Sequence, residues 1–339
     1  MPRSITSEQR PGAVRDAIVR PAIALTGATK SYRIYSNPAL HMVDALGVGW
    51  LPYVRRRPRP EFVALDTISL RIERGEKVGI VGRNGAGKTT TMKCLLNLLR
   101  PQRGQVRVFG LDPAQAEVDV KRRLAYVPDQ LAFYPWMTVR ETLDYLASFR
   151  EHWNGKKERE LFDRFGLDPA KRTDALSKGQ RTQLALIAAI CPEPDLLVLD
   201  EPTSGLDPIV RREFIETVIG AYQEGQPGSR TILVSTHLIA EFEGLIDEFT
   251  IIDQGAAVLT LEADLARERY QRIRARFTQA PPDMDLKGAL RVRREGRELE
   301  LIANGGGSAL MESLRRHNPE TLTTEALTLE EIFVAALKS

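Results

Sequence analysis

Short apolar segments alternate with longer helical patterns along most of the chain. Between about 131 and 178 the pattern is mostly helical, with Leu143, Leu146 and Phe149 at helical spacing. Strands that alternate with helices favour a parallel sheet, so the pattern predicts an α/β fold with a largely parallel sheet and a helical insertion. The predicted strands lie at 22–26, 68–72, 78–81, 195–200, 231–236 and 249–255.

From about residue 271 the chain has a different pattern. Ile273, Ala275 and Phe277 alternate with arginines, which predicts a strand with one buried face. A hairpin is predicted to follow, with its turn at Glu295 and Gly296. These features begin a small α+β unit.

Two helices complete this unit in the prediction. One starts at about Ser308, after the glycines at 305–307, and the other lies at the C-terminal end of the sequence. Thr328 and Glu331 have the spacing of a capping box at the start of the last helix. We therefore expect a separate α+β domain over 263–339.

The first part of the chain contains two segments outside the regular pattern. Residues 1–20 lack the apolar stretch of a signal peptide and are expected to form a flexible tail. Residues 38–60 form an insertion, in which Asn37 and Pro38 could start a helix and several arginines follow. The insertion either packs on the neighbouring domain or docks against a membrane subunit or an anionic leaflet.

Composition limits the class of protein. Lys and Arg total 48 against 45 Asp and Glu, so no broad nucleic-acid surface is implied. Cys94 and Cys191 sit beside apolar residues without metal-ligand spacing, which predicts reduced core thiols. The longest apolar run, 184–191, is far shorter than the roughly 20 residues that cross a bilayer. We expect a cytoplasmic location.

A phosphate-binding loop is predicted between the strand at 78–81 and the helix that follows it. In such a loop, glycines let backbone amides converge on phosphate oxygens, Lys88 adds positive charge, and the Thr89 hydroxyl can bind Mg²⁺. The helix N-terminus favours an anion in the same place. The loop comprises Gly82, Arg83, Asn84, Gly85, Ala86, Gly87, Lys88, Thr89 and Thr90.

Two acidic residues at the end of a buried strand complement this loop. Asp200 ends the apolar strand at 195–200, where its carboxylate can hold the metal or a metal-bound water. Glu201 is expected to project in another direction by strand alternation and to polarise the attacking water. The pair predicts nucleoside triphosphate hydrolysis.

The order and spacing of the motifs resemble the ATP-binding cassette ATPases. They are the phosphate loop, "LSKGQ" at 176–180, "LVLDEP", "SGLD" at 204–207 and "VSTH" ending at His237. The resemblance covers residues 22 to about 260. It implies an ATP-binding domain at 21–262, with a mixed, mainly parallel sheet, an antiparallel β portion and a helical subdomain at about 131–180. ATP and Mg²⁺ are the implied cofactors.

The resemblance also implies roles for individual residues. Lys88, Glu201 and His237 would be catalytic, with His237 sensing the γ-phosphate, and Tyr32 would stack on adenine, with Tyr35 as its competitor. The remaining roles depend on a second cassette, identical or related, whose γ-phosphate the signature motif would contact. Those residues are Ser177, Gly179 and Gln180 of the signature and Asp207, which would make a contact across the dimer.

Two positions depart from the family pattern. Lys178 replaces the usual second glycine of the signature motif. The position that usually carries a metal-facing glutamine aligns with Asp129, while Gln130 comes one residue later. Either side chain could reach the metal, so both stay candidates.

The motifs and their context favour a transporter subunit. The ribosome-associated class usually carries two cassettes in one chain, and the DNA-repair class separates its motifs by a long coiled coil. A catalytically idle scaffold would lack Lys88, Glu201 or His237, all of which are present. An exporter ATPase bound to an integral membrane subunit on the cytoplasmic face is therefore expected.

Two exporter classes share features with this chain. The segments at 133–143 and 328–337 resemble the ABC-2 type exporter ATPases, whereas 32–38 and the phosphate loop resemble ATPases that export polysaccharides and teichoic acids. The cargo is left open between small amphipathic compounds and a polysaccharide or lipid-linked glycan.

Overall fold

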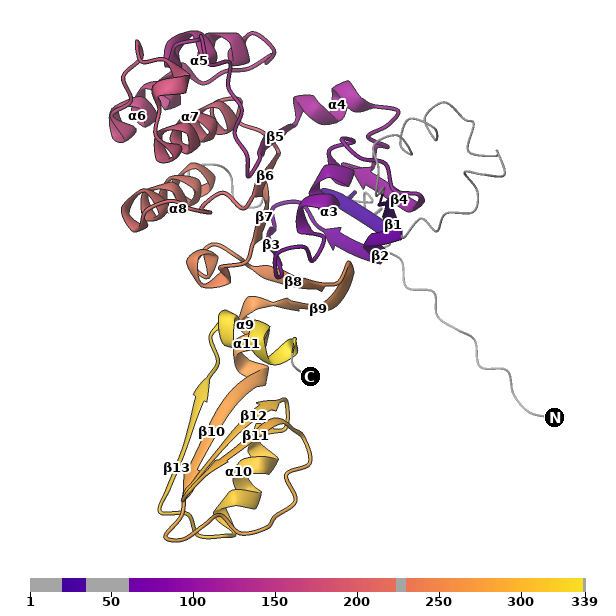
Figure 1. Cartoon of the computed structure of the whole chain (residues 1–339), viewed down its shortest axis with the longest axis vertical. Helices are drawn as coiled ribbons and strands as arrows, with labels where there is room; N and C mark the ends of the chain where they lie inside the picture. Colours follow the sequence, from indigo (N-terminus) through magenta and orange to yellow (C-terminus); the bar gives the residue numbers. More distant parts are fainter. Residues whose placement is uncertain (1–19, 35–60, 224–229, 338–339) are drawn as a thin grey trace, which may run out of the picture.

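The computed structural model describes residues 20–34, 61–223 and 230–337 (Figure 1). The expectations for the insertion at 38–60, for Tyr35 and for residues 1–19 of the tail fall outside these described residues. None of the helices in the described ranges is both long and apolar enough to span a bilayer.

The central sheet is mainly parallel, as the alternation of strands and helices predicted. Its neighbouring strands pair in parallel except at one edge, where β9 runs antiparallel to β8. The strands β6, β7 and β3 are almost entirely buried, which explains their continuous apolar sequences. Across the sheet the order is β5 (Leu124–Val127), β6 (Leu196–Asp200), β7 (Thr231–Thr236), β3 (Lys77–Val81), β8 (Glu248–Asp253) and β9 (Ala256–Glu262).

A second sheet is antiparallel and has the order β2 (Glu61–Ile72), β1 (Ile23–Arg33) and β4 (Arg103–Val108). Ile68, Leu70 and Ile72 of β2 are buried, as their alternation predicted. The strand predicted at 22–26 was too short, because β1 pairs with β2 as far as Arg33. Apolar runs alone did not mark this extension, whose residues are largely polar.

Helices cover the central sheet and form a separate group at one end of it (Figure 1). The group comprises α5 (Val139–Ala147), α6 (Gly155–Phe165) and α7 (Lys178–Ile190). Leu143 of α5 is buried, but α5 ends before Phe149, which is 67% exposed, so the helical spacing predicted through Phe149 is wrong. Among the described residues before 270, the other helices are α3 (Lys88–Leu95), α4 (Glu117–Arg122), η1 (Thr173–Ala175), α8 (Pro208–Gln223), η2 (Ile239–Phe242) and α9 (Ala263–Arg269).

The C-terminal unit contains an antiparallel sheet and a helix that packs on it (Figure 1). Ile273 and Ala275 face this helix side and are buried together with Leu301 and Leu310. In the hairpin, Glu295 pairs with Glu298, so the turn lies at Gly296 and Arg297, one residue later than predicted. The sheet has the order β11 (Ala289–Glu295), β12 (Glu298–Asn304), β10 (Tyr270–Arg276) and β13 (Thr321–Ala326), and the helix is α10 (Gly307–Arg315).

The last helix, α11 (Leu329–Ala336), joins the C-terminal unit to the central core. Thr328 and Glu331 form the predicted capping box at its start. Leu329 and Ile332 belong to the same buried cluster as Ile239 and Phe242 of η2. The α+β unit therefore ends inside the hydrophobic core of the preceding domain.

Cys94 and Cys191 are both buried and free, in agreement with the predicted core thiols. Burial raises the pKa of the Cys191 thiol to about 12. A thiol that stays protonated at neutral pH is a poor nucleophile, so Cys191 acts as a small apolar core residue.

We predict that Ile332→Ala destabilises the fold while leaving the exposed face of α11 unchanged. Ile332 is completely buried, and truncating such a side chain costs about 2–5 kcal/mol of unfolding free energy. Chemical denaturation would measure the loss. Val334→Ala on the same helix is the matched control, because Val334 is 38% exposed. Equal destabilisation by the two variants would contradict the packing of α11 into the core.

Candidate functional site

The predicted phosphate loop is a tight turn between β3 and α3. A Cβ on Gly82 would lie 2.4 Å from the Ile252 carbonyl oxygen, so only glycine fits there. At Gly87 the backbone φ is 111°, and a Cβ would lie 2.7 Å from the Ala64 oxygen. Gly87 occupies the N-cap of α3 and offers no side-chain cap. The first amides of α3 can therefore bind an anion.

Lys88 lies in the loop and is 5% exposed. Its ammonium donates hydrogen bonds to the carbonyl oxygens of Gly82, at 2.7 Å, and Arg83, at 3.3 Å. It also forms an ion pair with Glu201, whose Oε1 is 2.9 Å away. The positive charge is thus held at the centre of the loop by groups that a phosphate could replace.

Asp200 ends β6 and is 1% exposed. Its carboxylate accepts hydrogen bonds from Ser235 Oγ at 2.5 Å, Thr89 Oγ1 at 3.1 Å and the Tyr126 hydroxyl at 3.3 Å. Burial and the nearby charge of Asp200 raise the pKa of Tyr126, which keeps its hydroxyl protonated as a donor. These bonds fix the orientation of a carboxylate beside a loop hydroxyl.

The arrangement of Thr89 and Asp200 fits Mg²⁺, which takes oxygen ligands from one or two carboxylates and from substrate phosphates. Among the described residues, no group of three or more His, Cys, Asp or Glu side chains could hold a metal ion. The side chains alone would therefore leave much of the coordination shell to phosphate oxygens and water.

Glu201 leaves the strand in a left-handed conformation, with φ of 47°. Its amide donates to the Ser235 carbonyl oxygen at 3.0 Å, and its Oε2 lies 2.7 Å from Nδ1 of His237. The expected change of direction after Asp200 is present, but strand alternation was the wrong reason for it. The backbone turn brings Glu201 between Lys88 and His237.

Tyr32 lies on β1 beside the start of α3. Burial, with the Cys94 thiol nearby, raises the pKa of Tyr32, and a hydrogen bond with Thr90 partly offsets this effect. The ring is 38% exposed, and the Lys30 ammonium lies 5.4 Å from its centroid. An exposed aromatic ring therefore stands next to the phosphate loop, where a base could stack.

The signature residues lie at the start of α7, away from the phosphate loop in Figure 1. Ser177 caps α7 and forms a capping box with Gln180, while Gly179 sits close to Val210. Lys178 extends over Gly205, where an added Cβ would fall 2.9 Å from its ammonium. The structure does not bring these residues together with Lys88 or Asp200 within one chain.

Asp207 and the pair Asp129 and Gln130 lie on loops. Asp207 caps α8 by accepting hydrogen bonds from the amides of Ile209 and Val210, both at 3.1 Å. Asp129 and Gln130 follow β5 and are exposed. Burial and the charge of Asp200 are the main causes of the raised pKa of Tyr126, and the charge of Asp129 adds to them, so Asp129 lies near Tyr126.

Sequence reasoning missed Ser235 and Tyr126. Ser235 is completely buried on β7 and also accepts a hydrogen bond from the Glu201 amide at 3.2 Å. A serine near the end of an apolar strand, two residues before His237, was the available signal. Tyr126 lies in the apolar strand β5, where only its hydroxyl group distinguished it from its neighbours.

Comparisons with known proteins identify relatives of this chain. A protein-family match described as ABC transporter covers residues 65–204. The probable multidrug ABC transporter ATP-binding protein YbhF of Escherichia coli is 35% identical over 188 residues, which are 54% of this chain and 32% of YbhF. The chain thus spans about a third of that relative's length.

Two further comparisons cover most of the compared protein. The bacitracin transport ATP-binding protein BcrA of Bacillus licheniformis is 31% identical over 211 residues, 62% of this chain and 68% of BcrA. A solved structure of the ATP binding subunit of an ABC transporter is 25% identical, with a TM-score of 0.58, and the match covers 73% of this chain and 92% of that one. The site and these similarities together show that the chain belongs to the ABC transporter family, among its ATP-binding proteins.

Proposed function

We propose that the chain is the ATP-binding and ATP-hydrolysing subunit of an ABC transporter, which drives transport through a separate membrane subunit. One observation carries the proposal: Lys88, Asp200, Glu201 and His237 converge at one phosphate-binding loop. Each of these groups has a chemical task in phosphoryl transfer to water, where positioning and charge stabilisation supply most of the rate.

The resting contacts suggest how ATP would engage the site. The phosphates would accept hydrogen bonds from the amides of the loop and from the ammonium of Lys88. They would thereby compete with the carboxylate of Glu201 for the positive charge of Lys88. Glu201, released from Lys88, could then accept a proton from water, while His237 keeps hold of its other oxygen. Tyr32 would stack on the adenine.

Thr89 and Asp200 would hold Mg²⁺ together with the phosphate oxygens. The ion would neutralise charge that develops on the phosphates. The hydroxyls of Ser235 and Tyr126 would keep the Asp200 carboxylate aimed at that position.

A second cassette, identical or related, would complete each site. Ser177, Gly179 and Gln180 lie at the start of α7, a helix that is apart from α3 and the loop before it (Figure 1). Ser177 is exposed. A phosphate on a partner cassette could reach this helix start. Asp207, exposed at the start of α8, would lie at the same interface.

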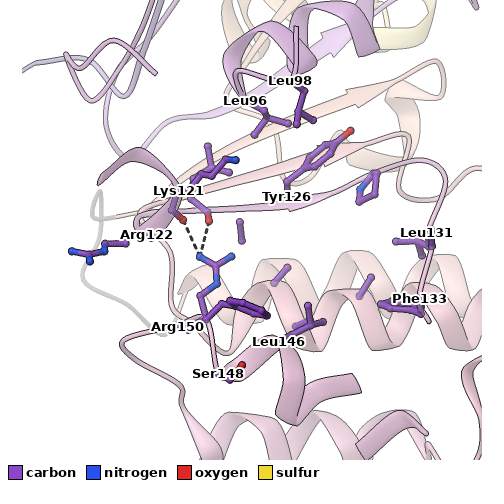
Figure 2. A pocket seen from close by; sticks show the side chains of 18 of the residues that line it. Leu96, Leu98, Lys121, Arg122, Tyr126, Leu131, Phe133, Leu146, Ser148 and Arg150 are labelled. Carbon is purple, nitrogen blue, oxygen red and sulfur yellow. Dashed lines mark hydrogen bonds between the residues drawn. The ribbon is translucent and has the colours of Figure 1, made fainter. Parts of the chain in front are cut away.

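The membrane subunit would dock in a groove of about 830 Å³ between the central sheet and the helical group (Figure 2). Leu98 and Phe149 on its rim are 55% and 67% exposed, and Arg150 donates to the carbonyl oxygens of Lys121 and Leu124. Such a groove suits an amphipathic segment. Tyr126 also lines it and hydrogen-bonds Asp200, so an occupant would contact a residue of the nucleotide site.

The exporter type and location are part of the proposal. The names of YbhF and BcrA refer to multidrug and bacitracin transport, which favours a small amphipathic cargo. A glycan cargo is the alternative. Its sequence basis includes the insertion at 38–60, outside the described residues. The subunit would work at the cytoplasmic face of the membrane, bound to its membrane partner.

We predict that Lys88→Ala lowers ATP hydrolysis by at least about 100-fold, because a preorganised charge on the phosphates is lost. Phosphate release from the purified chain would measure it. Lys93→Ala is the matched control, since Lys93 lies in the last turn of the same helix. Wild-type activity in Lys88→Ala would contradict the proposed site.

Glu201→Gln is predicted to bind ATP but to hydrolyse it about 10² to 10⁴-fold more slowly, because the general base is lost. An ATP-bound dimer should then accumulate, and light scattering with Mg²⁺ and ATP would detect it. Lys88→Ala in the same experiment should stay monomeric. A monomer for Glu201→Gln would exclude the homodimer and point to a related partner cassette.

Asp129→Asn is predicted to slow ATP turnover about tenfold, because Asp129 would face the metal and help to orient its ligands. Gln130→Ala should change turnover less than about threefold, because its side chain would not face the metal. The proximity of Asp129 to Tyr126 is the reason for this ranking. The Mg²⁺ dependence of hydrolysis should shift in the first variant only. The opposite ranking would assign the metal-facing position to Gln130.

A further inference from the structure

The short helix η2 follows His237 almost directly and is fixed in the core. Ile239 and Phe242 of this helix are completely buried. The amide of Leu238 donates to Thr236 Oγ1 at 2.9 Å, which closes the turn that carries His237. The backbone that carries His237 is therefore held between the end of β7 and the buried helix η2.

Glu241 of η2 binds the segment between Glu201 and Asp207. Its Oε2 accepts a hydrogen bond from Thr203 Oγ1 at 2.7 Å, and its Oε1 lies 2.5 Å from Arg211 Nη1. Arg211 in turn donates to the carbonyl oxygen of Leu206 at 3.0 Å. One carboxylate thus holds the segment at Thr203 directly and at Leu206 through Arg211.

These contacts hold the segment at Thr203 and Leu206 in a fixed position relative to η2. Thr203 is 2% exposed, and the side chain of Glu241 is 14% exposed. Charge-assisted hydrogen bonds away from water are short, strong and directional. Glu241 contacts the segment that precedes Asp207, whereas His237 contacts Glu201, which comes just before that segment in the sequence.

We infer that Glu241 is a positioning residue for the hydrolytic step, an inference that rests on the proposed ATPase function. Through Thr203 and Arg211 it couples the segment 203–207, here called the Asp207 loop, to the turn at 236–238 that carries His237. The two segments therefore move together. A second cassette that contacts Asp207 would thereby bring Glu201 and His237 into the arrangement that hydrolyses ATP. Glu241 acts through Thr203 and Arg211, which engage both of its carboxylate oxygens.

Glu241→Gln tests this role because it removes the charge and keeps the shape. Glu243→Gln is the matched control from the adjacent end of η2. Glu243 pairs with Arg267 at 3.3 Å and accepts from the Leu329 amide at 3.4 Å, so it faces the C-terminal unit instead of the Asp207 loop. Each variant loses one Arg–Glu ion pair, that of Glu241 within η2 or that of Glu243 directly after it.

Glu241→Gln should lower kcat about tenfold, with KM for ATP changed less than about twofold, since small misplacements of catalytic groups affect the rate more than binding. Glu243→Gln should keep kcat within about twofold of the wild-type value. Thr203→Val and Arg211→Met should each slow turnover, and combining either with Glu241→Gln should add little. The last result would place all three in one coupled unit.

Amide exchange without nucleotide provides a readout that does not depend on hydrolysis. The amides of residues 203–207 should exchange faster in Glu241→Gln than in the wild type, while Glu243→Gln should leave them unchanged. Equal kcat losses in the two variants, or unchanged exchange at 203–207, would overturn the inference. Absence of ATP hydrolysis by the wild-type chain, with exchange altered as expected, would instead refute the proposed function on which the hydrolytic role rests.

Discussion

The register between the parallel strands β6 and β7 is the constraint on which the site depends. Asp200 pairs with Ser235 across these strands, and Val81 at the end of β3 pairs with Thr236. The carboxyl ends of all three strands therefore meet at one edge, where ligands bind in α/β sheets. A shift of one residue would turn Asp200 and Ser235 to opposite faces and remove their 2.5 Å hydrogen bond.

The ion pair between Lys88 and Glu201 has a cost that ATP could relieve. Both side chains are nearly buried, and removing two charges from water is expensive unless the geometry compensates. The carbonyl oxygens of Gly82 and Arg83 and the ring of His237 provide part of that compensation. Phosphate oxygens would offer Lys88 a stronger partner and return Glu201 to water, so nucleotide binding and activation of the base would be one exchange of partners.

Sequence patterns predicted the conformation of the loop at 82–90 and of the strand before Asp200 better than they predicted strand lengths and turns. The glycines at 82 and 87 and the buried strand before Asp200 each have a local physical cause, so their letters predict their geometry. The extension of β1 to Arg33 depends on pairing with distant strands, which no local pattern contains. Glu201 illustrates the same limit, because its direction comes from a left-handed backbone and not from strand alternation. Tyr126 and Ser235 could be recognised only once the sheet placed them beside Asp200.

Tyr126 lines the groove and also contacts the candidate nucleotide site, which gives a physical route between them. Tyr126 presents its ring to the groove and its hydroxyl to Asp200, so a segment that moves the ring also moves a hydrogen bond to the carboxylate. On the opposite side of the site, η2 packs its buried face against α11 and extends Glu241 toward the Asp207 loop. The residues proposed to bind phosphate thus lie between two structural connections, one to the groove proposed as the docking site and one to the C-terminal unit. Because packed cores shift between discrete arrangements, a change at either connection would reach Glu201 and His237 without any contact with the nucleotide.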